Sequence, residues 1–339
     1  MTSVIAGARS RSRIAPAVAV LSVGCGVIPE VSLGDGPLDA TDEPIADAVA
    51  DASDGAPDDV LADSCAIPLD PSCDPFGPPE LVQELSSGAA NGYDEDPTLT
   101  SDMLEIYFLS TRDGGPGHGD VWTSIRASAD ASWGVPTLVQ SVSSPDRETS
   151  PAVTFDGLGL YVASDRDGGQ GGYDIWMSSR AGATSDWSAP VLVTELNTAG
   201  DDIPRPPGNH SLAIPVSYRI SVSYEYQIYM AYRASAVAGW STPTLLTWVD
   251  TANLDVDGFL SDDALSFALS SDRLNGVGKQ DLFLASRTDS LSAFGTPVTL
   301  ASLNTDTSRE AHPWVSPDLH EVYFDSDRSG VPRIYHATR

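Results

Sequence analysis

The sequence predicts an all-β fold for residues 76–339, a five-bladed β-propeller of four-stranded antiparallel blades. Three observations predict it. Short motifs recur five times at a period of 53 to 57 residues, which is typical of propellers and other repeat folds. The segments between them alternate apolar and polar residues with the period of two that marks β-strands. The first and last repeats are both incomplete, and each supplies what the other lacks.

Four motifs keep the same period along the chain. An aromatic residue followed three positions later by proline begins at Phe76, Trp133, Trp187, Trp240 and Phe294. A Ser-x-Arg triplet begins at Ser110, Ser164, Ser217, Ser271 and Ser326. A polar residue followed by an aliphatic and an aromatic residue begins at Asp120, Asp174, Gln227, Asp281 and Arg333. A basic residue closes each unit at Arg126, Arg180, Arg233, Arg287 and Arg339.

Each repeat contains four short strands. Residues 104–108 and 158–162 alternate as strands do, with Asp turns before them and glycine-rich loops after them. One strand precedes the Asp turn, one ends in Ser-x-Arg, one carries the third motif and one follows the proline. Four antiparallel strands repeated radially form a propeller blade.

The ends of the chain predict how the ring closes. The last repeat stops at Arg339, after its third strand, and the first repeat contributes only the strand at 79–85. Pairing the two fragments completes the fifth blade and removes the exposed sheet edges that an open ring would leave.

The motif at 164–176 reads SDRDGGQGGYDIW and resembles the repeats of TolB-type, WD-like bacterial propellers. The resemblance covers all five units. It is weakest in the third, where Tyr218 replaces the central Asp of the triplet and Pro215 interrupts the strand. The resemblance implies an exported propeller from a family made mostly of periplasmic interaction modules.

Residues 1–25 are typical of an export signal, with three arginines before a short apolar run. Leu21 to Cys25 resembles a bacterial lipobox, which implies that Cys25 is lipidated; cleavage without lipidation and an uncleaved start are the alternatives. Residues 26–75 are predicted to be an acidic disordered tether, because they bury too little apolar surface to offset the entropy of ordering. Cys65 and Cys73 predict a disulfide in an exported chain, with two free thiols as the alternative.

Carboxylates at the start of the first strand of each repeat are candidate ligand-binding residues. They are Asp94, Glu148, Asp201, Asp255 and Glu310. Since the first strands surround the propeller axis, these side chains are expected to form a ring at one mouth of the channel. They could make ion pairs and hydrogen bonds within each repeat, bind a cation such as calcium, or act as the acid and base of a glycosidase.

Large unrepeated residues near the axis are further candidates for ligand binding. Arg205 and Trp314 share one register, and His312 falls in the register of Asp96, Ser150, Ile203 and Val256. Such residues could either plug the channel or contact a ligand. The arginines of the Ser-x-Arg triplets are expected to pair with the aspartates of the third motif in the same blade.

The sequence therefore predicts an exported, lipid-anchored monomer at the bacterial outer membrane, periplasm or cell surface. Its expected role is to bind an envelope protein or polysaccharide, with no catalysis, no cofactor and no metal. A net charge of −30 disfavours nucleic-acid binding, because such a surface repels phosphates. The alternative is a glycan-active hydrolase that uses the mouth carboxylates.

Overall fold

The computed structural model describes residues 75–88, 92–219 and 226–339. The predicted leader and tether lie outside the described residues, and so do Cys25, Cys65 and Cys73. The predictions of lipidation and of a disulfide therefore stay predictions. Within the described ranges, no helix is long and apolar enough to cross a membrane.

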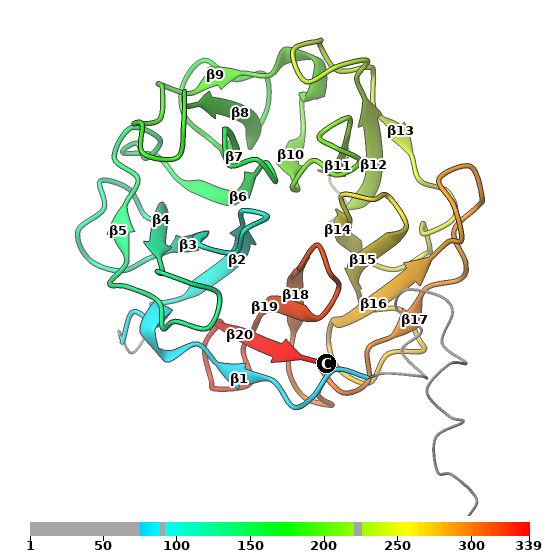
Figure 1. The fold of residues 1–339 in the computed structure, drawn as a ribbon. Coiled ribbons are helices and arrows are strands. Elements are labelled where there is room, and N and C mark those ends of the chain that lie inside the picture. Colours follow the sequence, from blue (N-terminus) through cyan, green and yellow to red (C-terminus); the bar gives the residue numbers. More distant parts are fainter. Residues whose placement is uncertain (1–74, 89–91, 220–225) are drawn as a thin grey trace, which may run out of the picture. The chain divides into compact units, whose positions relative to one another are not determined.

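Five four-stranded antiparallel sheets surround one axis, which confirms the predicted propeller (Figure 1). Blade 1 contains β2 (Asp94–Leu99), β3 (Glu105–Ser110), β4 (Asp120–Ile125) and β5 (Thr137–Leu138). Blade 2 contains β6 (Glu148–Val153), β7 (Gly159–Ser164), β8 (Asp174–Ser179) and β9 (Val191–Leu192). Blade 3 contains β10 (Asp201–Pro204), β11 (Ala213–Arg219), β12 (Gln227–Tyr232) and β13 (Thr244–Leu245). Blade 4 contains β14 (Asp255–Leu260), β15 (Ser266–Ser271), β16 (Asp281–Ser286) and β17 (Val298–Thr299). Blade 5 contains β18 (Glu310–Val315), β19 (Glu321–Ser326), β20 (Arg333–Thr338) and β1 (Glu80–Leu81). Two short 3₁₀ helices, η1 (Gln83–Leu85) and η2 (Thr194–Leu196), complete the described elements.

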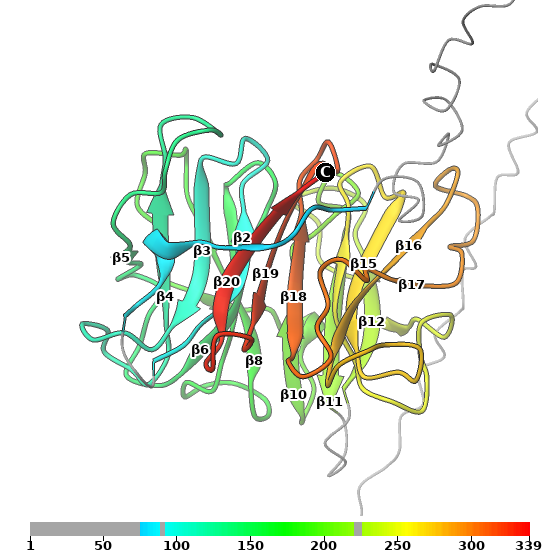
Figure 2. The same ribbon diagram turned by 90° about the horizontal axis from the view of Figure 1, so that it is seen from below.

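The first strand closes the ring as predicted. In Figure 2 the segment that carries β1 lies against β20, and Glu80 is the Cα partner of His336. The amide of Gly77 donates a 2.7 Å hydrogen bond to the carbonyl of Thr338. Leu85 is fully buried in the same hydrophobic cluster as blade 5 residues, so this segment contributes to the core as well as to the sheet.

The repeated aromatic residues hold the blades together. The basic residue that ends each repeat lies over the ring of the aromatic-Pro motif in its own blade, at 4.3–5.8 Å from ring centre to guanidinium carbon. Three of the tryptophans also pack edge-to-face against a tyrosine of the neighbouring blade; the pairs are Trp133–Tyr323, Trp187–Tyr107 and Trp240–Tyr161. The contacts of these three tryptophans therefore pack neighbouring blades against each other.

Blade 3 is the irregular one, as the sequence predicts. Its inner strand β10 has four residues and pairs with β11 without a register shift. The inner strands of the other four blades have six residues each, and each contains a register shift.

Candidate active site

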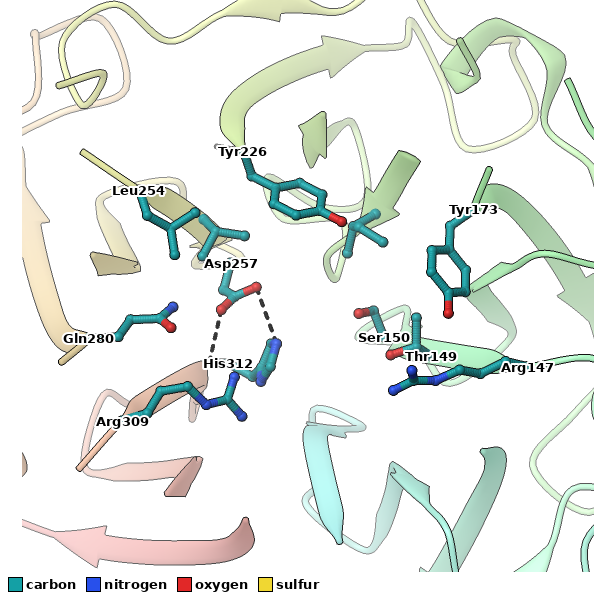
Figure 3. Close-up of a pocket in the computed structure, with 12 residues that line it drawn as sticks. Arg147, Thr149, Ser150, Tyr173, Tyr226, Leu254, Asp257, Gln280, Arg309 and His312 are labelled. Carbon is teal, nitrogen blue, oxygen red and sulfur yellow. Dashed lines mark hydrogen bonds and ion pairs between the residues drawn. The ribbon is translucent and has the colours of Figure 1, made fainter. Parts of the chain in front are cut away.

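A cavity of about 270 Å³ opens where the inner strands β6, β10, β14 and β18 begin (Figure 3). Its lining side chains come from four blades and include Arg147, Tyr173, Tyr226, Asp257, Arg309 and His312. Of the eight candidate ligand-binding residues, only His312 lines this cavity.

A β-bulge in four of the inner strands brings polar groups to the axis. The bulge residues are Asp96, Ser150, Asp257 and His312, and all four have φ between 47° and 60°. Residues other than glycine rarely adopt this conformation, and it persists where surrounding contacts fix it. The contacts run from blade to blade: the Ser150 amide donates to Asp96 at 3.1 Å, and the His312 amide donates to Asp257 at 3.4 Å.

These bulges correct one expected register. Asp257 occupies the bulge position equivalent to His312, whereas the sequence placed Val256 there. The fourth repeat is offset by one residue, because Asp255 pairs with Ser271 in the sheet as Asp94 pairs with Ser110.

His312 lies at the centre of three carboxylates from three blades. Its Nδ1 is 2.5 Å from Asp325, and its Nε2 is 2.8 Å from Asp96 and 3.4 Å from Asp257. Burial by itself lowers the pKa of His312, but the three carboxylates outweigh it and hold the pKa well above its ordinary value. The imidazole is therefore a cation that ties blades 1, 4 and 5 together.

Arg205 and Trp314 are part of the interior below this cluster. Arg205 is 1% exposed; it contacts Asp96 at 3.5 Å and donates to the carbonyl of Pro313 at 3.3 Å. Trp314 is fully buried and packs edge-to-face against Phe259. Neither residue lines the cavity. Both therefore fill the interior of the propeller, as the first of the two expected roles requires.

Asp96, His312 and Asp325 are spaced as the ligands of a metal site would be, but His312 is protonated, whereas a metal ligand must be neutral. Their potential ligand atoms lie within 4.8 Å of one another. Both ring nitrogens of His312 face carboxylate oxygens, and a protonated imidazole has no lone pair for a metal. The set also offers few of the oxygen ligands that calcium prefers, so these residues fit a bound cation poorly.

Glu95 does not line the cavity itself, but it contacts Arg309, which does. It accepts a 2.7 Å hydrogen bond from Arg309, and 15% of its side chain is exposed. Burial, reinforced by the neighbouring Asp325, raises the pKa of Glu95 to about 7, while Arg309 lowers it in part. The next residue has the opposite behaviour. Burial opposes ionisation of Asp96, yet His312 and Arg205 outweigh it and hold its pKa well below the ordinary range.

The five carboxylates of the predicted ring are held inside the blades. Each forms a salt bridge with the arginine of the Ser-x-Arg triplet in its own blade; the pairs are Asp94–Arg112, Glu148–Arg166, Asp201–Arg219, Asp255–Arg273 and Glu310–Arg328. In all blades but the third, the serine of the triplet also donates to the carboxylate. The carboxylate side chains are at most 10% exposed, and none lines the cavity.

The expected pairing of these arginines with the aspartates of the third motif is wrong. Asp120, Asp174 and Asp281 instead accept hydrogen bonds from backbone amides of the glycine-rich loops, such as that of Gly171 at 3.1 Å. The loops need glycine because a Cβ at Gly169 would lie 2.0 Å from the Asp174 carboxylate.

Arg147 and Arg309 are the functional candidates that sequence reasoning missed. They occupy equivalent positions, one residue before β6 and one before β18, where the other repeats have Tyr93, Gly200 and Leu254. The central Asp of the triplet fixes this position: Asp165 accepts from the Arg147 amide at 2.9 Å, and Asp327 from the Arg309 amide at 2.8 Å. A comparison of this position across the five repeats would have shown two arginines among unlike residues.

Comparisons with known proteins establish the fold. No protein-family model and no curated protein sequence matches the chain. The endo-arabinase of Bacteroides thetaiotaomicron is 12% identical; the match covers 78% of this chain and 98% of that one, with a TM-score of 0.53. A family 62 α-L-arabinofuranosidase of Coprinopsis cinerea is 10% identical over 78% of this chain and 96% of that one, with a TM-score of 0.49. A TolB protein of Agrobacterium tumefaciens is 14% identical over 76% of this chain and 82% of that one, with a TM-score of 0.43.

These neighbours include a TolB-like propeller and correct the expected function. The sequence favoured a non-catalytic binding module of the cell envelope. The endo-arabinase shares this fold, so the fold itself does not support a non-catalytic role, and that expectation is corrected.

Proposed function

We propose that this protein is a glycan hydrolase whose active site is the cavity at the mouth of the propeller. The observation that carries the proposal is Glu95, a carboxyl group with a pKa of about 7 beside the cavity-lining Arg309. Glycosidases use two carboxyl groups, one protonated to donate to the leaving oxygen and one ionised to act on the sugar or on water. Glu95 is half protonated near neutral pH, as a proton donor should be.

Asp257 is the proposed ionised partner. It lines the cavity, and its orientation is fixed by Ser270, whose hydroxyl donates to it at 3.0 Å, and by the imidazolium of His312. In the proposed reaction Glu95 gives its proton to the glycosidic oxygen as the bond to the anomeric carbon breaks. Asp257 stabilises the positive charge that develops on the sugar. A water molecule then adds its oxygen to the anomeric carbon and gives one proton to Glu95, which restores the acid.

The shared fold supports a polysaccharide as substrate. The neighbour with a TM-score of 0.53 is an endo-arabinase, and a mouth lined by side chains from several blades can accept a chain from outside. Tyr173 and Tyr226 project over the cavity in Figure 3, where their rings can lie against sugar faces.

A hydrolysis screen tests the proposal. The protein is incubated with arabinan, pectin and other plant and bacterial polysaccharides, and reducing ends are measured. The Glu95→Gln and Asp257→Asn variants should each lose at least about 100-fold in kcat, and wild-type activity should fall as the pH rises through about 7. Glu84→Gln is the control, because Glu84 is exposed and does not line the cavity. Absence of hydrolysis across the screen, or full activity in Glu95→Gln, would refute the assignment.

Export and lipid anchoring complete the proposal. They are supported by the charged and apolar pattern of residues 1–25 and by the lipobox-like segment ending at Cys25. We also propose that the repeats belong to the TolB-type family, because they share its motifs. Labelling with a fatty-acid analogue should mark the wild type and spare a Cys25→Ala variant; label retained by the variant would exclude lipidation.

A further inference from the structure

We infer that the cavity selects a sugar unit that carries a carboxylate, a uronic acid, and that Arg147 and Arg309 bind that carboxylate. The inference rests on the proposed site and names its substrate class. It is argued from the charge, the contacts and the placement of the two arginines.

Arg147 lacks a carboxylate partner in a protein that is rich in them. The chain has 48 acidic and 18 basic residues other than histidine, yet Arg147 forms no salt bridge with any described residue. Its Nε is buried without a hydrogen-bond partner among the described residues, and its polar neighbour is the hydroxyl of Tyr173. A guanidinium in a cavity without a carboxylate partner is a site for an anion, since a planar carboxylate matches its donors.

The two guanidinium groups face each other. In Figure 3, Arg147 enters from the blade 2 side and Arg309 from the blade 5 side, and both point toward the middle of the cavity. Arg309 uses Nη2 to bind Glu95 and Asp325, and no described residue bonds to the other two nitrogens of its guanidinium group. The anchoring of both backbones by Asp165 and Asp327 fixes this arrangement before a ligand arrives.

The charges of the site also favour an anion. The lining contains three cations, Arg147, Arg309 and His312, against one carboxylate, Asp257. Behind them Arg205 adds a positive charge, and Asp96 and Asp325 add two negative ones. When Glu95 holds its proton, the group of four cations and three carboxylates has an excess of one positive charge, which a uronate neutralises. The site is therefore positively charged, although the whole protein has a net charge of −30.

Calorimetric titration with two matched ligands tests the inference. The probes are trigalacturonic acid and its fully methyl-esterified form, which differ in charge and not in sugar sequence. They are titrated into the wild type and into Glu95→Gln, where turnover does not consume the ligand. The acid should bind at least about tenfold more tightly than the ester, as expected of a hydrogen bond to a charged group. Arg147→Gln should remove the difference, and Arg147→Lys should keep part of it.

The outcomes separate this inference from the proposed hydrolysis. Equal affinity for acid and ester, no binding of the acid, or an unchanged preference in Arg147→Gln overturns the inference. Tighter binding of a sulfated trisaccharide than of the uronate also overturns it, because the anion would then be a sulfate ester. Arg147-dependent binding of the acid supports the ligand class even if no glycan is hydrolysed, in which case only the proposed reaction fails.

Discussion

Replacing Glu95 by glutamine should stabilise the protein in alkaline solution and have little effect in acid. The folded protein holds the Glu95 proton up to about pH 7, whereas the ordinary glutamate pKa is 4.5. Because the folded pKa is the higher one, the stability associated with this proton is complete below pH 4.5 and is lost as the pH rises through 7. Glutamine keeps an oxygen for Arg309 but has no proton to lose.

The size of the effect follows from the width of that window. Each pH unit between the two pKa values corresponds to about 1.36 kcal/mol, so the wild type loses about 3 kcal/mol across it. Between pH 5 and pH 8.5, most of this difference, about 2–3 kcal/mol, should appear as a growing advantage of Glu95→Gln over the wild type.

Urea denaturation at a series of pH values measures the stability difference between Glu95→Gln and the wild type. The free energy of unfolding of the wild type, Glu95→Gln and the exposed control Glu84→Gln is determined from pH 5 to pH 8.5. The control should run parallel to the wild type. A difference between Glu95→Gln and the wild type that stays constant with pH would refute the raised pKa and, with it, the proposed proton donor.

Three further predictions concern the rest of the fold. Deletion of residues 76–86, which removes β1 and the buried Leu85, should abolish the cooperative unfolding transition, whereas deletion of residues 29–60 should leave the melting temperature unchanged. Gly258→Ala should cost about 1–3 kcal/mol in urea denaturation, because its Cβ would lie 2.6 Å from Phe267; Gly295→Ala, where the nearest atom is 3.5 Å away, should be close to neutral. A chelator should leave the melting temperature within about 1 °C, since a protonated His312 occupies the only described metal-like cluster; a rise on adding calcium would contradict this reading.

The fold could be predicted from the sequence because each blade is held together by the same interactions between the same types of residue. An arginine that lies over an aromatic ring and a carboxylate that pairs with the triplet arginine recur in every blade, so each leaves a residue at a fixed spacing. The variation is also readable. Thr111 replaces the central Asp in the first triplet, and its hydroxyl accepts from the Tyr93 amide at 2.9 Å as Asp165 does from Arg147.

The site could be predicted only in part. The repeated carboxylates were predicted to bind a ligand because they recur in the sequence. They recur because each one forms a salt bridge with an arginine in its own blade, which leaves none of them to bind a ligand. The residues that line the cavity differ from blade to blade. The inner-strand bulges then decide which side chain turns to the axis, and a bulge adds a residue without a clear sequence signal. His312 was found because it is singular. Glu95 was not, because its raised pKa arises from burial in the folded ring and from Asp325 of another blade.

The strand that closes the ring has a consequence for how the protein is made. Glu80 is among the first residues of the propeller to leave the ribosome, and its partner His336 is almost the last. Blades 1 to 4 can form as the chain emerges, but blade 5 stays incomplete until β20 has been made, and closing so long a loop is slow. Until then the chain presents unpaired strand edges at both ends. A chain truncated near its C-terminus would keep them permanently, and we expect it to aggregate rather than to persist as a four-bladed fragment.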